Sequence, residues 1–290
     1  MQTSPAILLS YQPPWRWQQF HDHFALRALA GVEQLSADRY CRSFQLDGVK
    51  GWFSVEPLEA QEALLLRHSH SANACLPALI QRVRRMFDLD ADPLRIAAHF
   101  AEDPHLAPSF ARQPNLRLPT AFDPFEQAVR AIVGQQITVK AAVTISARLV
   151  NRLGEPLADA DPLAPQRLFP TPAAIASANL EGIGMPGKRV QCLQHFAEQI
   201  ANGALRLDID EGSQALIERL CALPGIGPWT AQYIALRAFG EADAFPASDL
   251  GLLKAPLWGA GGITAKQLSV RAEAWRPWRA YAAVHLWFGG

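Results

Sequence analysis

The chain has 290 residues, of which 49% are hydrophobic and 19% charged, and its 27 basic and 27 acidic residues leave no net charge. A chain of this length and apolar content can bury the cores of about two domains, so an intrinsically disordered protein is excluded. The zero net charge gives no bulk electrostatic support for a nucleic-acid partner, which would have to be recognised from local features.

The four cysteines, Cys41, Cys75, Cys192 and Cys221, are far apart and form no CxxC pair. This spacing argues against a disulfide framework, a zinc ribbon and a cysteine-ligated iron–sulfur cluster, and it fits a reducing cytoplasm. The short apolar run at residues 6–9 lacks the preceding basic residues of a signal peptide, and no run approaches the roughly 20 apolar residues of a membrane span. The sequence therefore predicts a cytoplasmic protein with no membrane partner.

The N-terminal part of the chain has the segments most typical of strands. Short apolar or alternating runs at residues 6–11, 40–46 and 51–55 predict strands, and Asp47-Gly48 predicts a hairpin turn. From residue 76 onward, apolar residues recur at helical spacing. We expect a small antiparallel sheet followed by an almost wholly helical remainder.

A proline-bearing loop at residues 108–119 is the expected domain boundary. It divides the chain into an N-terminal α+β lobe at residues 1–115 and a mainly helical part at residues 116–290. After the loop, Asp123 can cap a helix that begins with the next residue, a proline, and continues to about Arg152. The expected fold class is therefore α+β.

Two glycine-rich turns each stand directly before a helical run. The first, at residues 182–187, precedes the run at 188–201, and the second, at residues 223–228, precedes the run at 229–238. Backbone N–H groups at a helix start lack intrahelical partners and can bind phosphate, and glycine permits a close approach. A glycine-rich joint between helices can also be purely structural. Just before the second turn, however, the sequence predicts an apolar helix, which completes a helix–hairpin–helix pattern.

The second turn and its surroundings resemble the helix–hairpin–helix base-excision DNA glycosylases, and among them the bacterial DNA-3-methyladenine glycosylase II family. The resemblance rests on Leu-Pro-Gly-Ile-Gly-Pro-Trp-Thr-Ala at residues 223–231 and on Phe-Pro-Ala-Ser-Asp at residues 245–249. Nearly the whole chain is covered, because further similar segments lie at residues 11–15, 116–119, 131–135 and 275–279 with Tyr281.

This resemblance implies a monomeric enzyme with two helical lobes around a cleft, which flips a damaged base out of double-stranded DNA during base-excision repair. Its substrates would be alkylated purines of the 3-methyladenine and 7-methylguanine type, released by hydrolysis of the N-glycosidic bond. Alkylation at N3 or N7 makes the purine cationic and weakens that bond. The reaction requires no cofactor, although the family can hold a structural metal ion at the hairpin.

Asp249 is the expected catalytic residue, because the catalytic aspartate of the family falls on this position, 20 residues after Trp229. By spacing alone, an aspartate before the apolar run at residues 250–253 would equally well be a helix cap. Breaking an N-glycosidic bond builds positive charge on the sugar, so a fixed carboxylate stabilises the transition state and can orient or deprotonate a water. Lyase members have a lysine before Thr230 that forms a Schiff base. Trp229 at this position predicts attack by water and an intact abasic product.

Trp229, Tyr233 and Trp287 match positions that line the base pocket of the family. Electron-rich ring faces attract a cationic base by about 0.5–2 kcal/mol, although each aromatic could also be an ordinary core residue. Gln136 stands where better-known relatives have an apolar residue that fills the space of the flipped nucleotide. A glutamine can fill that gap and hydrogen-bond the orphaned base, or it can be an ordinary polar residue within a helix.

The hairpin is the expected anchor for the DNA backbone. The resemblance assigns DNA contact to Leu223, Gly225, Ile226, Gly227 and Thr230. A Cβ atom at either glycine would obstruct a phosphate or strain the turn. Residues 251–290 add the basic residues Lys254, Lys266, Arg271, Arg276 and Arg279 against the single acidic Glu273, which indicates either a basic edge or a solvated helix face.

Metal ligation by side chains is not expected. His21-x-His23 and His68-x-His70 lack a supporting cluster of Cys or carboxylate residues, so surface or packing roles are favoured. Two alternatives to an alkylpurine glycosylase stay open. One is a glycosylase of the same superfamily that acts on deaminated or oxidised bases. The other is a noncatalytic helix–hairpin–helix DNA-binding protein, which would need the hairpin but neither Asp249 nor the aromatic pocket.

Overall fold

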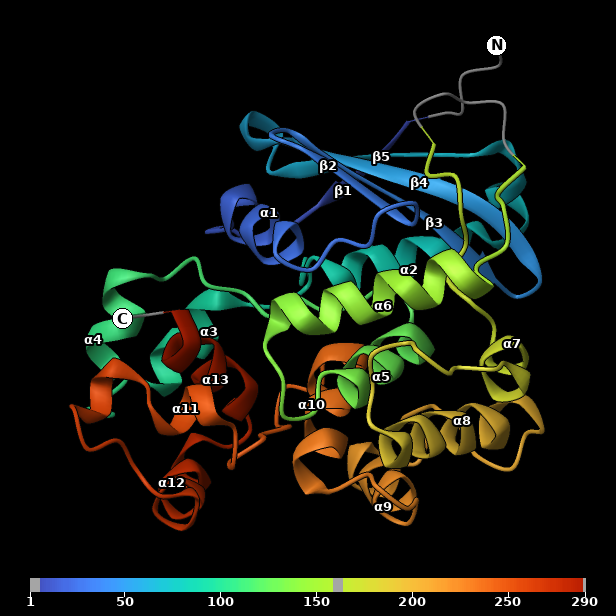
Figure 1. Cartoon of the computed structure of the whole chain (residues 1–290). Coiled ribbons are helices and arrows are strands. Elements are labelled where there is room, and N and C mark those ends of the chain that lie inside the picture. The colour runs from blue at the N-terminus through green and yellow to red at the C-terminus, as the bar shows by residue number, and fades with distance from the viewer. Residues whose placement is uncertain (1–5, 159–163, 289–290) are drawn as a thin grey trace.

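The computed structural model describes residues 6–158 and 164–288 (Figure 1). Its N-terminal part forms a five-stranded antiparallel sheet with the strand order β1-β5-β4-β3-β2. The strands are β1 (Ile7–Ser10), β2 (Glu33–Ser36), β3 (Arg39–Leu46), β4 (Val49–Leu58) and β5 (Ala63–His68). The three predicted strands and the antiparallel sheet are thereby confirmed.

The turn between β3 and β4 is the predicted Asp-Gly hairpin. Asp47 and Gly48 have φ values of 51° and 80°, and positive φ at both positions lets the turn follow the right-handed twist of the strands. The sequence pattern does not indicate β2 or β5. Strand β2 is a mostly polar edge strand of four residues, and β5 is an apolar run without strict alternation, which fits a helix segment equally well.

Two helical lobes lie side by side below the sheet (Figure 1). The first contains α5 (Pro124–Val133), α6 (Val139–Leu153), α7 (Pro172–Ser177), α8 (Gly187–Ala201), α9 (Ser213–Cys221) and α10 (Pro228–Phe239). The second contains α3 (Pro93–His99), α4 (Ala107–Arg112), α11 (Leu250–Leu253), α12 (Ala265–Ala272) and α13 (Arg279–Phe288). Helices α1 (Trp17–Ala25) and α2 (Leu76–Met86) belong to the N-terminal lobe, and short 3-10 helices span Glu59–Gln61, His70–Cys75, Pro256–Trp258 and Glu273–Trp275.

A buried aromatic core joins the sheet to α1 and α2. Phe24 of α1 lies 4.9 Å from Tyr40 of β3 between ring centroids, and Phe87, just after α2, lies 5.5 Å from Phe24. Phe53 of β4 packs at 4.9 Å against Phe122, which stands directly before the cap of α5. Packing against the N-terminal lobe therefore fixes the position in space of the first turn of α5. Helix α5 then continues toward the functional site.

The second helical lobe takes helices from both sides of the predicted domain boundary. Helix α4 packs against α13: Oγ of Ser109 lies 2.9 Å from Nδ1 of His285, and the ring of Phe110 stacks on His285 at 3.6 Å. The division at residues 115 and 116 stays a prediction. The predicted loop at 108–119 is wrong over its first part, because Pro108 lies in the first turn of α4, where proline is tolerated.

The predicted single helix from residue 124 to about residue 152 is also wrong. Helix α5 ends at Val133 and α6 begins at Val139. Between them Gln136 has a φ of 58°, a left-handed conformation that a right-handed helix cannot contain. Thr138 then caps α6, with its Oγ1 accepting the N–H of Ala141 at 3.2 Å. Gln136 therefore lies in an exposed turn and is not a helix residue.

Within the two described ranges, no helix combines the length and the apolar character that crossing a bilayer would require. None of the four cysteines, all within the described ranges, forms a disulfide.

The buried His285 should make the second helical lobe sensitive to acid. Burial lowers the pKa of its imidazole to about 3, whereas an unfolded histidine titrates near 6.5. Between these values the unfolded chain binds one more proton, so the free energy of unfolding falls as pH drops from 6.5 toward 3, by up to about 1.4 kcal/mol per pH unit. His285→Gln, which cannot titrate, should remove this part of the slope in urea titrations. His195→Gln, at a half-buried position, is the control. An unchanged slope in His285→Gln would contradict the role assigned to His285.

Candidate active site and DNA-contact surface

A cavity of about 390 Å³ lies where the three lobes meet. Its walls come from α1, β2 and β3 of the N-terminal lobe, from α5, α6 and α10 of the first helical lobe, and from α13 of the second. Trp229, Tyr233, Asp249 and Trp287 line it together, so the structure brings these four predicted residues to one place. Gln136 and the predicted hairpin contacts lie outside this lining.

The carboxylate of Asp249 is held by four N–H donors. Its Oδ1 accepts the backbone N–H groups of Gly251 at 2.9 Å and Leu252 at 3.2 Å, so Asp249 is the N-cap of α11. The indole Nε1 of Trp287 donates to Oδ1 at 2.9 Å, and that of Trp229 donates to Oδ2 at 2.9 Å. The helix-cap and active-site interpretations are therefore compatible, because the cap fixes the carboxylate inside the cavity.

The three aromatic rings form two walls at different angles. Trp229 and Tyr233, four residues apart on α10, stack with ring centroids 5.2 Å apart and planes within 12°. Trp287 of α13 meets Tyr233 edge-on, at 6.4 Å and 75°. Because Trp229 and Tyr233 already stack on each other, a flat base has to bind against an outer ring face and cannot enter between them.

Arg237 is a cavity residue that the sequence pattern did not reveal. Its guanidinium lies 4.8 Å from the ring centroid of Trp287 and 6.0 Å from that of Tyr233, and Nη1 donates to the carbonyl of Pro119 at 2.7 Å. Burial lowers the pKa of Arg237 to about 10, so the group is charged at neutral pH and occupies one face of Trp287. The sequence does contain a signal, since Arg237 is the only charged residue of α10 and lies four residues after Tyr233.

The two glycines of the hairpin have different environments. Gly225 has a φ of 88°, and a Cβ there would come within 2.9 Å of Sγ of Cys192. Gly227 is the N-cap of α10 with a φ of −95°, and no atom lies within 4 Å of its Cβ position. A Cβ would therefore strain the turn at Gly225 but not at Gly227, where the expected obstruction of a phosphate stays a prediction. Of the other predicted contacts, Ile226 and Thr230 have buried side chains and Leu223 is half-buried.

The turn formed by Gly134, Gln135 and Gln136 lies against this hairpin. Nε2 of Gln135 donates to the carbonyl oxygen of Gly225 at 3.0 Å and to Oγ1 of Thr230 at 3.1 Å. The exposed Gln136 and the exposed hairpin glycines therefore belong to one continuous surface beside the cavity.

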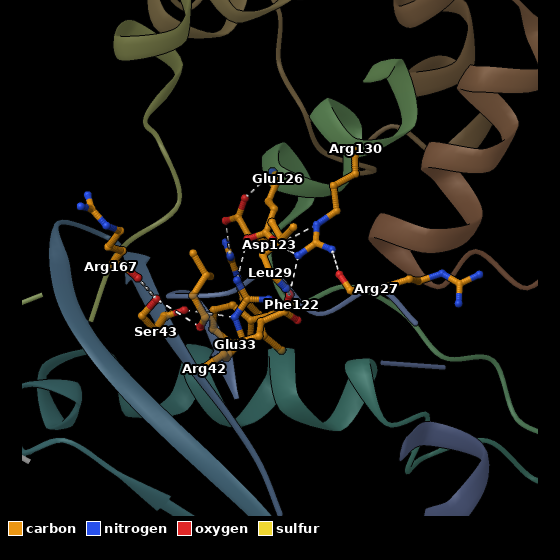
Figure 2. Close-up of polar contacts among 12 residues, drawn as sticks. Arg27, Leu29, Glu33, Arg42, Ser43, Phe122, Asp123, Glu126, Arg130 and Arg167 are labelled. Atoms are coloured by element: carbon orange, nitrogen blue, oxygen red, sulfur yellow. Dashed lines mark hydrogen bonds and ion pairs between the residues drawn. The ribbon is translucent and has the colours of Figure 1, made fainter. Parts of the chain in front are cut away.

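Three buried charged side chains and the half-buried Arg130 connect α5 to the N-terminal sheet (Figure 2). Nη2 of Arg42 on β3 lies 2.6 Å from Oε2 of Glu126, and Nη2 of Arg130 lies 2.6 Å from Oε2 of Glu33 on β2. Arg130 also pairs with Glu126 one turn away and donates to the carbonyl of Arg27 at 2.6 Å. Each of these charges thus has a partner of opposite sign, which offsets the free-energy cost of removing it from water. The network fixes α5 against the sheet.

The basic edge expected from residues 251–290 is weaker than the sequence count suggests. Arg276 pairs with Asp243 and, at 2.9 Å, with Glu273, while Nε of Arg279 lies 2.8 Å from Oδ1 of Asp243. The guanidinium of Arg271 stacks over Trp258 at 5.1 Å. The count missed Asp243 because it stands outside that segment of the sequence.

The described side chains include no group of three His, Cys, Asp or Glu residues that could hold a metal ion. His23 is buried and packs edge-on against Phe24, as favoured from the sequence. A metal ion at the hairpin therefore finds no support from side chains, and no reaction step is assigned to one.

Family models match two parts of the chain. Residues 6–123 match the AlkA N-terminal domain, and residues 129–280 match the HhH-GPD superfamily base excision DNA repair protein. The chain belongs to this superfamily. The family and the α+β fold class expected from the sequence are therefore confirmed.

Two curated relatives match almost the full chain. DNA-3-methyladenine glycosylase 2 of Escherichia coli is 34% identical over 284 residues, which cover 97% of this chain and 96% of that protein. The probable bifunctional transcriptional activator/DNA repair enzyme AlkA of Mycobacterium tuberculosis is 35% identical over 282 residues, which cover 97% of this chain and 56% of that protein. The chain thus spans about half the length of the mycobacterial relative.

Solved structures show the same fold. A 3-methyladenine DNA-glycosylase from Archaeoglobus fulgidus matches with a TM-score of 0.81 at 22% identity, covering 98% of this chain and 97% of that chain. An 8-oxoguanine glycosylase/lyase from Clostridium acetobutylicum, in complex with double-stranded DNA, matches with a TM-score of 0.72 at 17% identity, covering 100% of this chain and 98% of that chain. Since the second enzyme is named for an oxidised base, the fold alone does not distinguish the substrate classes.

Proposed function

We propose that this protein is a monofunctional DNA glycosylase that hydrolyses the N-glycosidic bond of alkylated purines in double-stranded DNA during base-excision repair. Its similarity to DNA-3-methyladenine glycosylase 2 along 97% of the chain supports this substrate class. The observation that carries the proposal is the carboxylate of Asp249, held by the indole N–H groups of Trp229 and Trp287 inside a cavity with aromatic walls.

The reaction begins when the damaged nucleotide leaves the duplex and its base enters the cavity. A purine alkylated at N3 or N7 is cationic, and the rings of Trp229 and Tyr233 offer it electron-rich faces. As the bond between C1′ and the purine nitrogen breaks, the electron pair stays with the base and neutralises it. Positive charge then develops on the sugar, where the Asp249 carboxylate stabilises it.

Oδ2 of Asp249 is the oxygen that faces the sugar or the attacking water. Among the described contacts, Oδ1 accepts N–H groups from Gly251, Leu252 and Trp287, whereas Oδ2 accepts one from Trp229. A carboxylate oxygen has about two lone-pair sites, so Oδ2 retains the capacity to accept a further hydrogen bond. Water forms the new bond to C1′ and loses one proton to Asp249 or solvent. The products are the free base and an intact abasic site.

The surface outside the cavity would bind the DNA. We assign a phosphate to the backbone N–H groups of Gly225 and Gly227, two exposed residues of the turn that leads into α10. Gln136 would fill the space of the flipped nucleotide. One chain supplies every group in this scheme, so we expect a monomer that needs no cofactor. Its four cysteines form no disulfide, which fits the cytoplasm.

Chromatography of the bases released from methylated duplex DNA tests this function. The expected products are 3-methyladenine and 7-methylguanine. Parallel duplexes that contain hypoxanthine or 8-oxoguanine test the other substrate classes, and release from these alone would replace the alkylpurine assignment. DNA binding without release of any base would indicate a noncatalytic binding protein.

Borohydride should trap no covalent complex between the protein and DNA during turnover. The position of the lyase amine holds Trp229, and no lysine is among the described residues that line the cavity. Strand cleavage should therefore need added alkali, which is measured on denaturing gels with a glycosylase/lyase as the positive control. Efficient trapping of the parent protein would mean that another amine attacks the sugar.

A further inference from the structure

One side chain ties the turn between α5 and α6 to the hairpin. The two hydrogen bonds of Gln135 reach Gly225 and Thr230, which are 90 and 95 residues further along the chain. Gly225 belongs to the hairpin turn, and Thr230 lies in the first turn of α10, next to Trp229. A single amide group therefore joins the segment that carries Gln136 to the segment assigned to a phosphate and to the helix that carries the aromatic wall.

Both acceptors of these hydrogen bonds are fixed in place. The backbone of Gly225 is left-handed and packs so closely on Cys192 that a Cβ atom would clash. Thr230 is 3% exposed. Gln135 is thus bound to a rigid element, and its position follows that of the hairpin.

The other side of the turn is anchored through α5. The N–H of Gly134 donates to the carbonyl of Arg130 at 2.9 Å, and the side chain of Arg130 is held by Glu33 and Glu126 in the buried network (Figure 2). The turn is therefore held by the N-terminal lobe on one side and by the hairpin on the other. Between these anchors stands Gln136, exposed and with a left-handed backbone.

We propose that Gln135 is a positioning residue that sets the place of Gln136 relative to the hairpin. Gln136 can then displace the base while the hairpin holds the adjacent phosphate. This inference rests on the proposed function. Extrusion of a nucleotide requires that one group fills the helical gap while another holds the backbone beside it. A displacement of about 1 Å between two such groups can cost about a hundredfold in rate, so a link between them affects extrusion more than stability.

Gln135→Met tests the proposal, because methionine keeps the length of the side chain and loses both hydrogen bonds. The probe is a duplex with a 2′-fluoro-7-methylguanine nucleotide, whose glycosidic bond resists cleavage, beside a 2-aminopurine that brightens on unstacking. We expect the extruded fraction and the single-turnover rate on methylated DNA to fall about tenfold or more. Binding to abasic-analogue DNA, which has no base to extrude, should stay within about twofold.

A matched control separates positioning from general stability. Nε2 of Gln194 also donates to backbone carbonyls, those of Ala176 at 3.2 Å and Ala178 at 2.8 Å, away from the cavity. Gln194→Met should lower the melting temperature without changing the extruded fraction. If Gln135→Met folds poorly, Gln135→Leu replaces it, because leucine is uncharged and has no N–H to donate.

A double-mutant cycle shows whether Gln135 acts through Gln136. In the Gln136→Ala background, the substitution Gln135→Met should change extrusion by less than about twofold, since residues that act together are not additive. Equal losses in both backgrounds, or parental extrusion by the single Gln135 variant, would overturn the proposal. A parent protein that extrudes the base but releases none from methylated DNA would overturn the proposed function instead.

Discussion

Asp249→Asn is expected to slow single-turnover release of 3-methyladenine by about a hundredfold or more, the scale of losing a positioned charge at a reacting centre. Asparagine is nearly the same size as aspartate, and its Oδ1 can still accept the N–H groups of Gly251 and Leu252 that form the cap. The variant therefore removes the charge and the acceptor of the Trp229 N–H while leaving the cap in place. Binding to abasic-analogue DNA should persist, because the hairpin is unchanged.

A second capping aspartate provides the matched control. Oδ1 of Asp92 accepts the N–H groups of Leu94 at 3.1 Å and Arg95 at 3.0 Å at the start of α3, outside the cavity lining. Asp92→Asn makes the same chemical change at a helix start and should leave base release at the parental rate. If Asp249→Asn also cleaves within a few-fold of the parent, Asp249 is a cap alone and the mechanism is wrong.

Three of the site residues that sequence could predict lie within or next to contiguous motifs. Asp249 and Trp229 belong to the two segments that carry the family resemblance, and Tyr233 follows Trp229 by one helical turn. The cap and the catalytic assignment of Asp249 compete on the sequence, because both use a carboxylate at the start of a helix. In the structure the capping carboxylate also lines the cavity, so the two assignments are compatible, and spacing alone could not show this.

The contacts that sequence could not predict join segments far apart in the chain. Gln135 reaches Gly225 across 90 residues, and Arg42 pairs with Glu126 across 84. Neither pair has a local signal, since helical or strand periodicity describes burial and not partners. The break at Gln136 was missed for a related reason. A non-glycine residue with positive φ is uncommon, and the hydrogen bonds that Gln135 donates link this turn to a hairpin far away in the sequence.

Gly227→Asp is expected to weaken binding to abasic-analogue DNA by about a hundredfold or more, because a carboxylate placed against a phosphate costs several kcal/mol. The fold should tolerate the change. Gly227 is the N-cap of α10, its φ is −95°, and its Cβ position is open. Aspartate is a favoured N-cap residue, so the melting temperature should stay equal or rise while DNA binding falls.

An equal or higher melting temperature together with weaker DNA binding would separate the loss of a DNA contact from damage to the fold. A substitution that damages the turn would lower both quantities, as expected for Gly225→Ala, whose Cβ meets Cys192. Gly227→Asn has the same size and the same capping ability without the charge, so it measures the steric part of the effect and should bind DNA more tightly than Gly227→Asp. Fluorescence anisotropy over a range of salt concentrations gives the affinities, and the gap between the two variants should shrink as salt screens the repulsion. Parental affinity in a folded Gly227→Asp variant would reduce the hairpin to a joint between helices, and the DNA phosphate would have to bind elsewhere.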